Sequence, residues 1–195
     1  MTEPAAPAPA TLHVPAHPVR VVTAASLFDG HDAAINVMRR LLQAQGAEVV
    51  HLGHDRSVDE VVKAAVEEDA TAVAISSYQG GHVEYFEYLV ERLAAEGRPG
   101  IRVYGGGGGV IVADEVERLA RAGVRIFTPE DGQRLGLAAM VNTIVAECDE
   151  ARSAEVDVEA LLAGSPAALA RALTAIEDGA VPEAAATELR AAAER

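Results

Sequence analysis

Asp29 and His31 stand two residues apart, with Gly30 between them, directly after an apolar run. A neutral imidazole nitrogen is a good ligand for a transition metal. A metal-bound histidine normally donates its other N–H to a carboxylate or a carbonyl, which fixes the tautomer and the orientation of the ring. Asp29 is close enough in sequence to accept a hydrogen bond from that N–H, and Gly30 lets the backbone turn between Asp29 and His31. The alternative is a histidine that caps a helix or lies exposed in a loop.

One histidine is too few to hold a free metal ion. His51, His54 and His82 follow other strand-like runs and show no ligand spacing. Cys148 is the single cysteine, which excludes an internal disulfide and a multi-cysteine zinc site. A metal at His31 would therefore have to arrive already held in a macrocycle with an open axial position.

Later stretches offer further contacts for a ligand. A hydroxyl at Ser76, where an apolar run ends, can bond a buried heterocycle nitrogen, although a serine there can equally bond its own turn. The five glycines at 105–109 would let a flat group approach the backbone, and the alternative is a flexible loop. They are not a dinucleotide fingerprint, which belongs after the first strand. The candidate contacts are Asp29, Gly30, His31, Ser76, Tyr78, Gly80, Gly81, Gly107, Gly108, Gly109, Phe127 and Thr128.

A parallel sheet would bring these residues to one edge. Apolar, β-branched runs alternate with stretches of helical periodicity, which predicts an α/β fold. We expect a flavodoxin-like (Rossmann-like) five-stranded parallel sheet of order 2-1-3-4-5, with helices on both faces. That order places ligands outside the carboxyl ends of the strands, next to strand 1. The expected strands are 19–25, 48–52, 72–76, 101–104 and 124–127, and the last is followed by a turn at 128–132. The expected helices are about 33–44, 58–66, 113–122 and 133–147, with one more after His82 that runs through Phe86 and Leu93 and is broken by Gly97.

Composition divides the chain and limits its partners. Residues 1–18 form a Pro/Ala-rich leader, residues 19–148 one domain, and residues 149–195 a segment of two or three short helices, expected to be a linker or docking segment. The net charge of −14 argues against nucleic acid and against an anionic membrane surface. Apolar runs are too short for a membrane span. No basic residue precedes Arg20, so we expect no targeting peptide and a cytoplasmic protein.

Three short blocks together resemble a known signature. Asp29-x-His31, Ser76-x-Tyr78 and Gly108-Gly109 stand in the order of the motif Asp-x-His-x-x-Gly, Ser-x-Leu, Gly-Gly of proteins that bind cobalamin base-off/His-on. Residues 19–148 thus resemble the cobalamin-binding domain of acyl-CoA mutases. The resemblance is greatest to the N-terminal domain of the fused isobutyryl-CoA mutases, and methylmalonyl-CoA mutases belong to the same family.

Two positions depart from the motif. Ala34 stands where the family has the glycine after Asp-x-His-x-x, and Tyr78 stands where it has leucine. Ala34 adds a methyl group at the start of the first helix, and Tyr78 is larger than leucine and adds a hydroxyl. At these two positions we expect the fit to cobalamin to differ from the fit in the family.

The resemblance implies a cofactor and a mode of binding. Adenosylcobalamin would bind with its dimethylbenzimidazole tail in a groove between strands 1 and 3, lined by Ser76 and the glycines. His31 would replace the tail as axial cobalt ligand, with Asp29 behind it. The cofactor then starts a radical rearrangement of a carbon skeleton, of the isobutyryl-CoA/n-butyryl-CoA type. The implied partners are a substrate-binding barrel and a GTPase chaperone domain, so the chain alone is expected to be inactive.

Other functions remain open. A corrinoid carrier of a methyltransferase would have a helical cap before the first strand, where this chain has only its proline-rich leader. A cobalamin-dependent sensor would need a basic DNA-binding segment, which the acidic balance disfavours. A receiver domain would want a lysine near strand 5, but the only lysine is Lys63.

Overall fold

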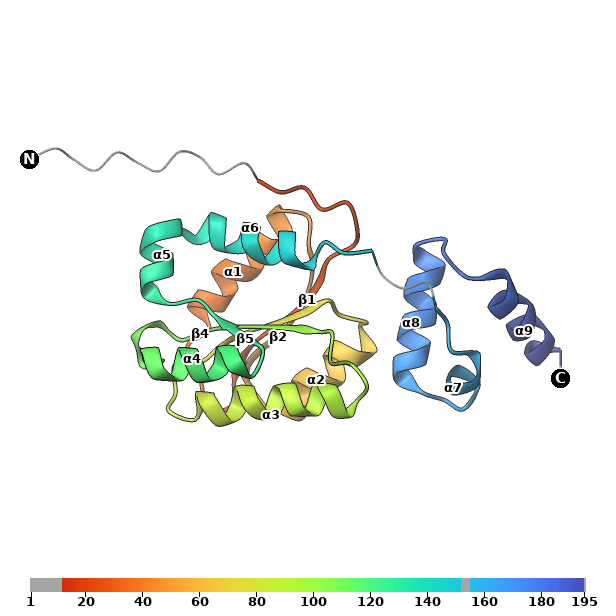
Figure 1. The fold of residues 1–195 in the computed structure, drawn as a ribbon, viewed down its shortest axis with the longest axis horizontal. Helices are drawn as coiled ribbons and strands as arrows, with labels where there is room; N and C mark the ends of the chain where they lie inside the picture. Colours follow the sequence, from red (N-terminus) through yellow and green to blue (C-terminus); the bar gives the residue numbers. More distant parts are fainter. Residues whose placement is uncertain (1–11, 152–154, 195) are drawn as a thin grey trace, which may run out of the picture.

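The predicted parallel sheet is present in the computed structural model, which describes residues 12–151 and 155–194 (Figure 1). Its five strands lie in the order β2-β1-β3-β4-β5, and every neighbouring pair is parallel. Both the sheet and its order are therefore confirmed. Residues 1–11 of the predicted leader lie outside the described residues. The strands are β1 (Arg20–Ser26), β2 (Glu48–Arg56), β3 (Ala72–Ser76), β4 (Arg102–Gly106) and β5 (Val124–Ile126).

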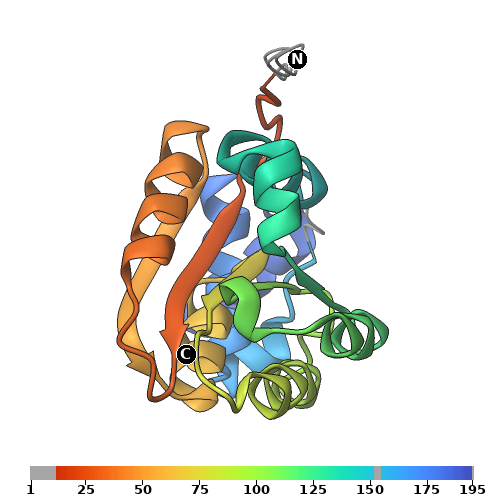
Figure 2. The same ribbon diagram turned by 90° about the vertical axis from the view of Figure 1, so that its left-hand side faces the viewer.

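Helices cover both faces of the sheet, as the apolar strands require. All five residues of β3, and all of β1 after Arg20, are buried. Strands buried on both faces have near-continuous apolar sequences, which is why β1 and β3 were recognisable. Figures 1 and 2 show helices over each face. One face carries α1 (Ala33–Ala44), α5 (Pro129–Leu135) and α6 (Leu137–Cys148), and the other carries α2 (Val58–Glu67), α3 (His82–Ala95) and α4 (Ala113–Arg121).

The segment after β5 differs from the prediction. The predicted turn at 128–132 is wrong, because most of it belongs to a helix, and the single helix predicted at 133–147 is divided into two. Thr128 caps α5 by accepting the Asp131 N–H, and Pro129 occupies the first turn, where its missing donor does no harm. Gly136, at φ +75°, then separates α5 from α6. A glycine at positive φ inside an apolar periodic stretch is the break that separates these two helices.

The glycine run is also more ordered than a loop. Gly105 and Gly106 belong to β4 and pair with Ile75 and Ser76 of β3. Residues Gly108–Val110 form one 3-10 turn, and α4 follows. The run therefore continues the sheet to its carboxyl edge before it turns away.

Three short helices follow the sheet domain, as predicted for the C-terminal segment. They are α7 (Val158–Leu162), α8 (Pro166–Glu177) and α9 (Glu183–Ala193). Helix α8 packs against α2, and its Arg171 pairs with the buried Asp69 at 3.3 Å. Its Glu177 lies 3.3 Å from the guanidinium of Arg20, at the start of β1. The segment thus contacts the amino-terminal side of the domain.

Residues 12–18 contain neither helix nor strand but are fixed to the end of α6. The imidazoles of His13 and His17 lie 2.6 and 2.9 Å from the two carboxylate oxygens of Asp149. The Ala16 N–H also donates to that carboxylate, at 2.9 Å. The Ala16 N–H, and then the two histidines, hold the pKa of Asp149 well below its usual range, against a smaller opposing effect of burial.

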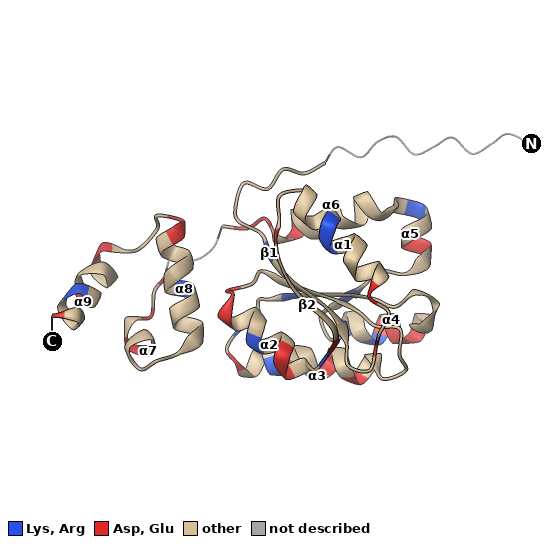
Figure 3. Ribbon diagram, turned by 180° about the vertical axis from the view of Figure 1, so that it is seen from behind, with Lys and Arg blue, Asp and Glu red and all other residues tan. Residues whose placement is uncertain are grey.

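Charged side chains pair between the helices that cover one face of the sheet. Figure 3 shows acidic and basic positions together on α2, α3 and α4. Arg118 of α4 pairs with Glu87 of α3, and Arg92 of α3 pairs with Asp59 of α2. Among the described residues, no helix is both long and apolar enough to cross a bilayer.

Candidate functional site

The loop between β1 and α1 holds Asp29 and His31 in the predicted relation. His31 Nδ1 lies 2.8 Å from Asp29 Oδ1, and the His31 backbone N–H donates to the same oxygen at 2.8 Å. A carboxylate oxygen can only accept a hydrogen bond, so Nδ1 must be the donor. In a neutral ring the proton therefore resides on Nδ1, and Nε2 keeps its lone pair. Nε2 has no hydrogen-bond partner among the described residues, and the His31 side chain is 75% exposed. The geometry leaves Nε2 available to an incoming metal.

Asp29 is the buried centre of this arrangement. Its side chain is fully buried, and its second oxygen accepts the backbone N–H of Tyr78 from the β3–α3 loop. The Tyr78 ring lies beside the His31 ring, with centroids 5.5 Å apart. One carboxylate therefore orients the imidazole and ties two loops together, and its bond to Tyr78 could not be placed from sequence spacing alone.

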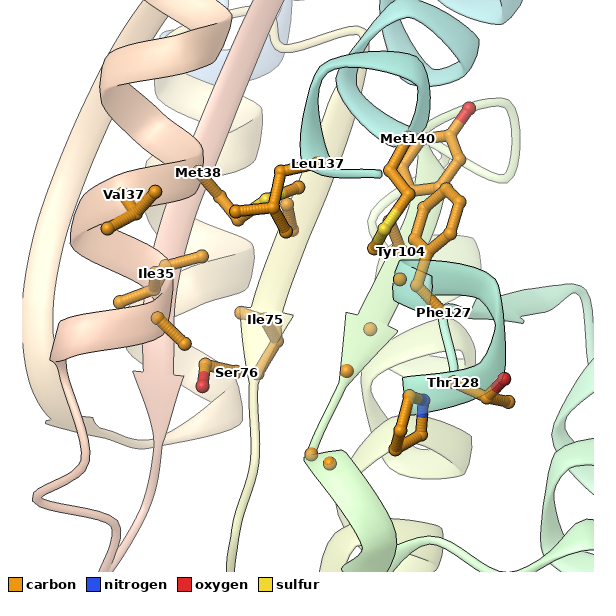
Figure 4. Close-up of a pocket in the computed structure, with 18 of the residues that line it drawn as sticks. Ile35, Val37, Met38, Ile75, Ser76, Tyr104, Phe127, Thr128, Leu137 and Met140 are labelled. Atoms are coloured by element: carbon orange, nitrogen blue, oxygen red, sulfur yellow. The ribbon is translucent and has the colours of Figure 1, made fainter. Parts of the chain in front are cut away.

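A large apolar cavity lies at the carboxyl edge of the sheet and reaches Tyr78. Its volume is about 550 Å³, within the usual range for small-molecule sites. Figure 4 shows Ile35 and Met38 of α1 on one side of it and Phe127 and Met140 on the other. The floor is formed by the ends of β3 and β4. It therefore lies over β3 and β4, between α1 and the α5–α6 pair, and the expected groove between strands 1 and 3 is wrong because β1 contributes no lining residue.

Ser76 places an unsatisfied hydroxyl in this cavity. Ser76 is 5% exposed, and its Oγ has no hydrogen-bond partner among the described residues. Neighbouring Ser77 is fully satisfied, since its Oγ accepts from Ser26 at 2.8 Å. A buried polar atom without a partner costs about 1–3 kcal/mol, so its presence in an apolar cavity points to a ligand atom that completes it.

The far end of the cavity is closed by stacked aromatic rings. Tyr104 of β4 and Phe127 lie parallel within 18°, with centroids 6.2 Å apart. The Tyr104 hydroxyl donates to Glu147 at 2.9 Å. Burial, more than its proximity to Cys148 and Glu147, raises the pKa of Tyr104 well above its usual range. Tyr104 is therefore a neutral wall of the cavity.

Most glycines of the run are required by the protein itself. A Cβ on Gly105 would lie 2.3 Å from the Phe86 ring, and one on Gly107 would lie 1.9 Å from the Ser77 carbonyl oxygen. Gly108 has φ +58°, and its Cβ would lie 3.0 Å from the Tyr78 ring. Gly109 has no neighbour within 4 Å. Close approach is thus real, but the chain's own atoms already occupy much of the space.

The structure brings most predicted residues together and leaves some apart. The cavity is lined by Ser76, Tyr78, Gly107, Gly108, Phe127 and Thr128, and Tyr78 joins it to the Asp29–His31 pair. Four predicted glycines, Gly30, Gly80, Gly81 and Gly109, do not line it. Gly81 instead is the residue from which α3 begins.

Sequence reasoning missed most of the two helical walls of the cavity, which are the α1 face and, opposite it, the α5–α6 pair. Ala34, Gly105 and Gly106, which the sequence had marked near the cofactor, also line the cavity. Helical periodicity marks the wall residues as apolar but does not separate core from cavity lining. The unpredicted lining residues are Ala33, Ile35, Val37, Met38, Leu42, Ala74, Ile75, Tyr104, Pro129, Gly132, Leu137, Met140 and Ile144.

His82 connects the two loops that border the cavity. It is buried, with Nδ1 2.9 Å from the Gln79 carbonyl oxygen and Nε2 2.9 Å from Glu115 Oε2. Glu115 also accepts the Val112 N–H at 2.9 Å, where α4 begins. The Val112 N–H first, and His82 next, lower the pKa of Glu115. The β3–α3 loop is thereby fixed to the segment after the glycine run.

Comparison with known proteins identifies the family of the domain. The profile described as "B12 binding domain" matches residues 19–133. The chain belongs to the B12-binding domain family. The matched range contains the whole sheet and both loops of the Asp29–His31–Tyr78 arrangement.

Relatives of this B12-binding domain are acyl-CoA mutases. It is 63% identical over 187 residues to the fused isobutyryl-CoA mutase of Nocardia farcinica, which covers 95% of this chain and 18% of that protein. It is 31% identical over 150 residues to the pivalyl-CoA mutase small subunit of Xanthobacter autotrophicus, covering 75% of this chain and 95% of that one. The chain thus spans under a fifth of the fused relative's length.

A solved structure shows the same fold. A cobalamin-binding protein from Desulfitobacterium hafniense superposes on this B12-binding domain with a TM-score of 0.56 and 24% identity. The match covers 67% of this chain and 59% of that one. At this identity the likeness concerns the fold, and it agrees with the sheet order described above.

Proposed function

We propose that this chain binds adenosylcobalamin base-off/His-on, with His31 as the axial cobalt ligand, and that it serves as the cofactor-binding domain of an isobutyryl-CoA type acyl-CoA mutase. The observation that carries this proposal is the buried Asp29 carboxylate, which holds His31 Nδ1 at 2.8 Å and leaves Nε2 unpartnered among the described residues. High identity to fused isobutyryl-CoA mutases supports the choice of reaction.

The residues present fit the cofactor. A heterocyclic nucleotide tail needs a cavity that is mostly apolar with a few polar atoms, and the 550 Å³ cavity with its unpaired Ser76 hydroxyl provides both. Ser76, Gly107 and Gly108 would hold the tail from the sheet edge, with Phe127 and Thr128 opposite. When bound, the cofactor supplies the radical that starts a carbon-skeleton rearrangement.

The chain's own residues bind and orient rather than react. Asp29 fixes the tautomer and direction of the imidazole, and Tyr78 joins that imidazole to the cavity wall. We therefore propose that no residue of this chain is catalytic, and that turnover needs a substrate-binding barrel domain or subunit. A GTPase chaperone domain and a cytoplasmic location stay predictions of the sequence.

We also propose that residues 149–195 are a linker or docking segment. The match to the fused relative extends over 187 residues, whereas the match to the nearly complete small subunit extends over 150. Part of this chain is therefore shared with the fused protein beyond what the small subunit contains. A corrinoid carrier or sensor role gains no comparable support, because the relatives of highest identity are mutases.

Electron paramagnetic resonance of bound cob(II)alamin tests the ligand directly. An axial 14N splits each cobalt line into three, and an axial 15N splits it into two, because their nuclear spins are 1 and 1/2. We expect the uniformly 15N-labelled chain with unlabelled cobalamin to give doublets. His31→Ala should abolish them, while His54→Ala, another exposed histidine at this edge, should keep them. Triplets in the labelled wild type would overturn the proposal.

A further inference from the structure

Phe28 adopts a conformation that bulky residues avoid. Its φ is +64°, and its side chain is 84% exposed. A non-glycine residue at positive φ is strained, and for a large side chain it is a genuine outlier. The ring gains nothing from burial in the protein core. Phe28 therefore destabilises the free chain through its backbone, and its exposed ring contributes no burial to offset that strain.

A second strained residue holds Phe28 in place. The Phe28 N–H donates to Asp55 Oδ1 at 2.8 Å, and Asp55 itself has φ +58°. The Asp55 N–H in turn reaches the Asp29 carbonyl oxygen at 3.3 Å. Two of the three positive-φ non-glycine residues in the described chain, one in the β1–α1 loop and one near the end of β2, are thus linked by hydrogen bonds. Strain of this kind persists where the surroundings enforce it, and it concentrates at ligand sites.

The position of the loop shows what the ring can meet. Phe28 directly precedes Asp29, the carboxylate that orients His31, so its backbone is fixed relative to the imidazole. The imidazole is exposed on the same loop. A flat macrocycle whose metal binds His31 Nε2 would spread over the neighbouring residues of that loop. Aromatic rings pack well on flat conjugated surfaces.

We propose that Phe28 is a contact residue for the lower face of the corrin ring. This inference rests on the proposed function and adds a cofactor contact outside the tail cavity, since Phe28 does not line it. The exposed ring is buried only when the cofactor binds, and the strain at φ +64° holds it ready for that contact. Phe28 is thus a residue that lowers the stability of the free chain in favour of affinity.

Two substitutions separate the ring from the backbone strain. Phe28→Ala removes the ring and keeps a Cβ at positive φ, so the dissociation constant for adenosylcobalamin should rise about tenfold while the melting temperature of the free chain stays the same. Phe28→Gly should weaken binding equally but raise the melting temperature by about 2 °C, because glycine adopts positive φ without strain. Phe28→Tyr should restore the affinity.

Equilibrium dialysis and thermal unfolding of the whole chain provide the measurements. Leu169→Ala is the matched control, since Leu169 is an exposed apolar residue on α8 and should change neither quantity. If wild type shows the 15N doublets and Phe28→Ala binds as tightly as wild type, the Phe28 contact is overturned and the proposed function stands. If Phe28→Ala lowers the affinity only when the catalytic partner is present, Phe28 contacts that partner, and the proposed contact with the corrin ring is also overturned. Absence of the doublets in wild type overturns the proposed function itself.

Discussion

The two edges of the sheet carry cavities of opposite character. At the carboxyl edge, the cavity of about 550 Å³ is mostly apolar and contains the unpaired hydroxyl of Ser76. At the amino edge, a cavity of about 370 Å³ is lined by charged residues that pair with one another. There the buried Asp69 bonds Arg98 and lies 3.3 Å from Arg171, and Arg102 bonds Glu150.

The contrast separates an edge whose polar groups stabilise the fold from an edge whose polar groups are free to contact a ligand. Buried charges at the amino edge are compensated within the chain, and they join the α2–β3 segment, the segment before β4, and α8. The carboxyl edge retains an unpaired hydroxyl, an exposed imidazole with a fixed tautomer, and strained Phe28. Native proteins seldom leave such features without a function. The difference therefore supports the proposed binding at the carboxyl edge and assigns the amino edge to stability.

The largest expected effect is at the amino edge. Asp69→Asn keeps the side-chain shape and suits the φ of +47°, but it leaves Arg98 without its buried counter-charge. We expect a loss of about 3 kcal/mol in the free energy of unfolding, measured by urea denaturation. The control Glu87→Gln removes an exposed partner of Arg118 and should lose under about 1 kcal/mol.

Acid titration of the same variant sharpens this result. Burial alone would raise the pKa of Asp69, but the bond to Arg98 and the charges of Arg98 and Arg171 lower it. Its contribution to stability is therefore complete above the unfolded pKa of about 3.9 and is lost as the pH falls through the lower folded pKa. Wild type should thus lose stability more steeply than Asp69→Asn below about pH 4. Equal slopes would show that Asp69 is not a stabilising charge.

An intermediate effect is expected from the glycine run. Gly107→Ala places a Cβ 1.9 Å from the Ser77 carbonyl oxygen, so the backbone must move. We expect a loss of about 1–3 kcal/mol and weaker cobalamin binding, because Ser77 follows the cavity residue Ser76. Gly109→Ala, with no neighbour within 4 Å, should change neither. Equal behaviour of the two variants would mean that the run is a flexible loop after all.

The smallest effect should be at Ser76, and it should differ in sign between stability and binding. Ser76→Ala removes a buried hydroxyl that has no partner in the described structure. The free chain should be unchanged or more stable by up to about 1 kcal/mol, while cobalamin affinity falls by about 1 kcal/mol for the lost hydrogen bond. Thermal unfolding and dialysis measure the two. A loss of stability together with full affinity would place Ser76 with the structural residues.

Some of this architecture could be predicted because local patterns impose it. Near-continuous apolar runs can only be central strands buried on both faces, which gave the positions of β1 and β3. The break at Gly136 was missed because apolar periodicity continues across it and nothing local shows that its φ is +75°. The carboxyl edge was predicted as the place of the site, but the helical walls of the cavity were missed because a core helix face and a cavity wall are equally apolar.

The sequence by itself determined the sheet, its order and the pairing of Asp29 with His31, because alternation of apolar segments and short-range spacing are local properties of the chain. Only the tertiary structure decided that Tyr78 supplies Asp29 with its third N–H. It alone showed that Ser76 lacks a partner and that Phe28 is strained and exposed. Contacts between loops depend on where strands from distant parts of the chain end, and one sequence carries no direct record of those distances.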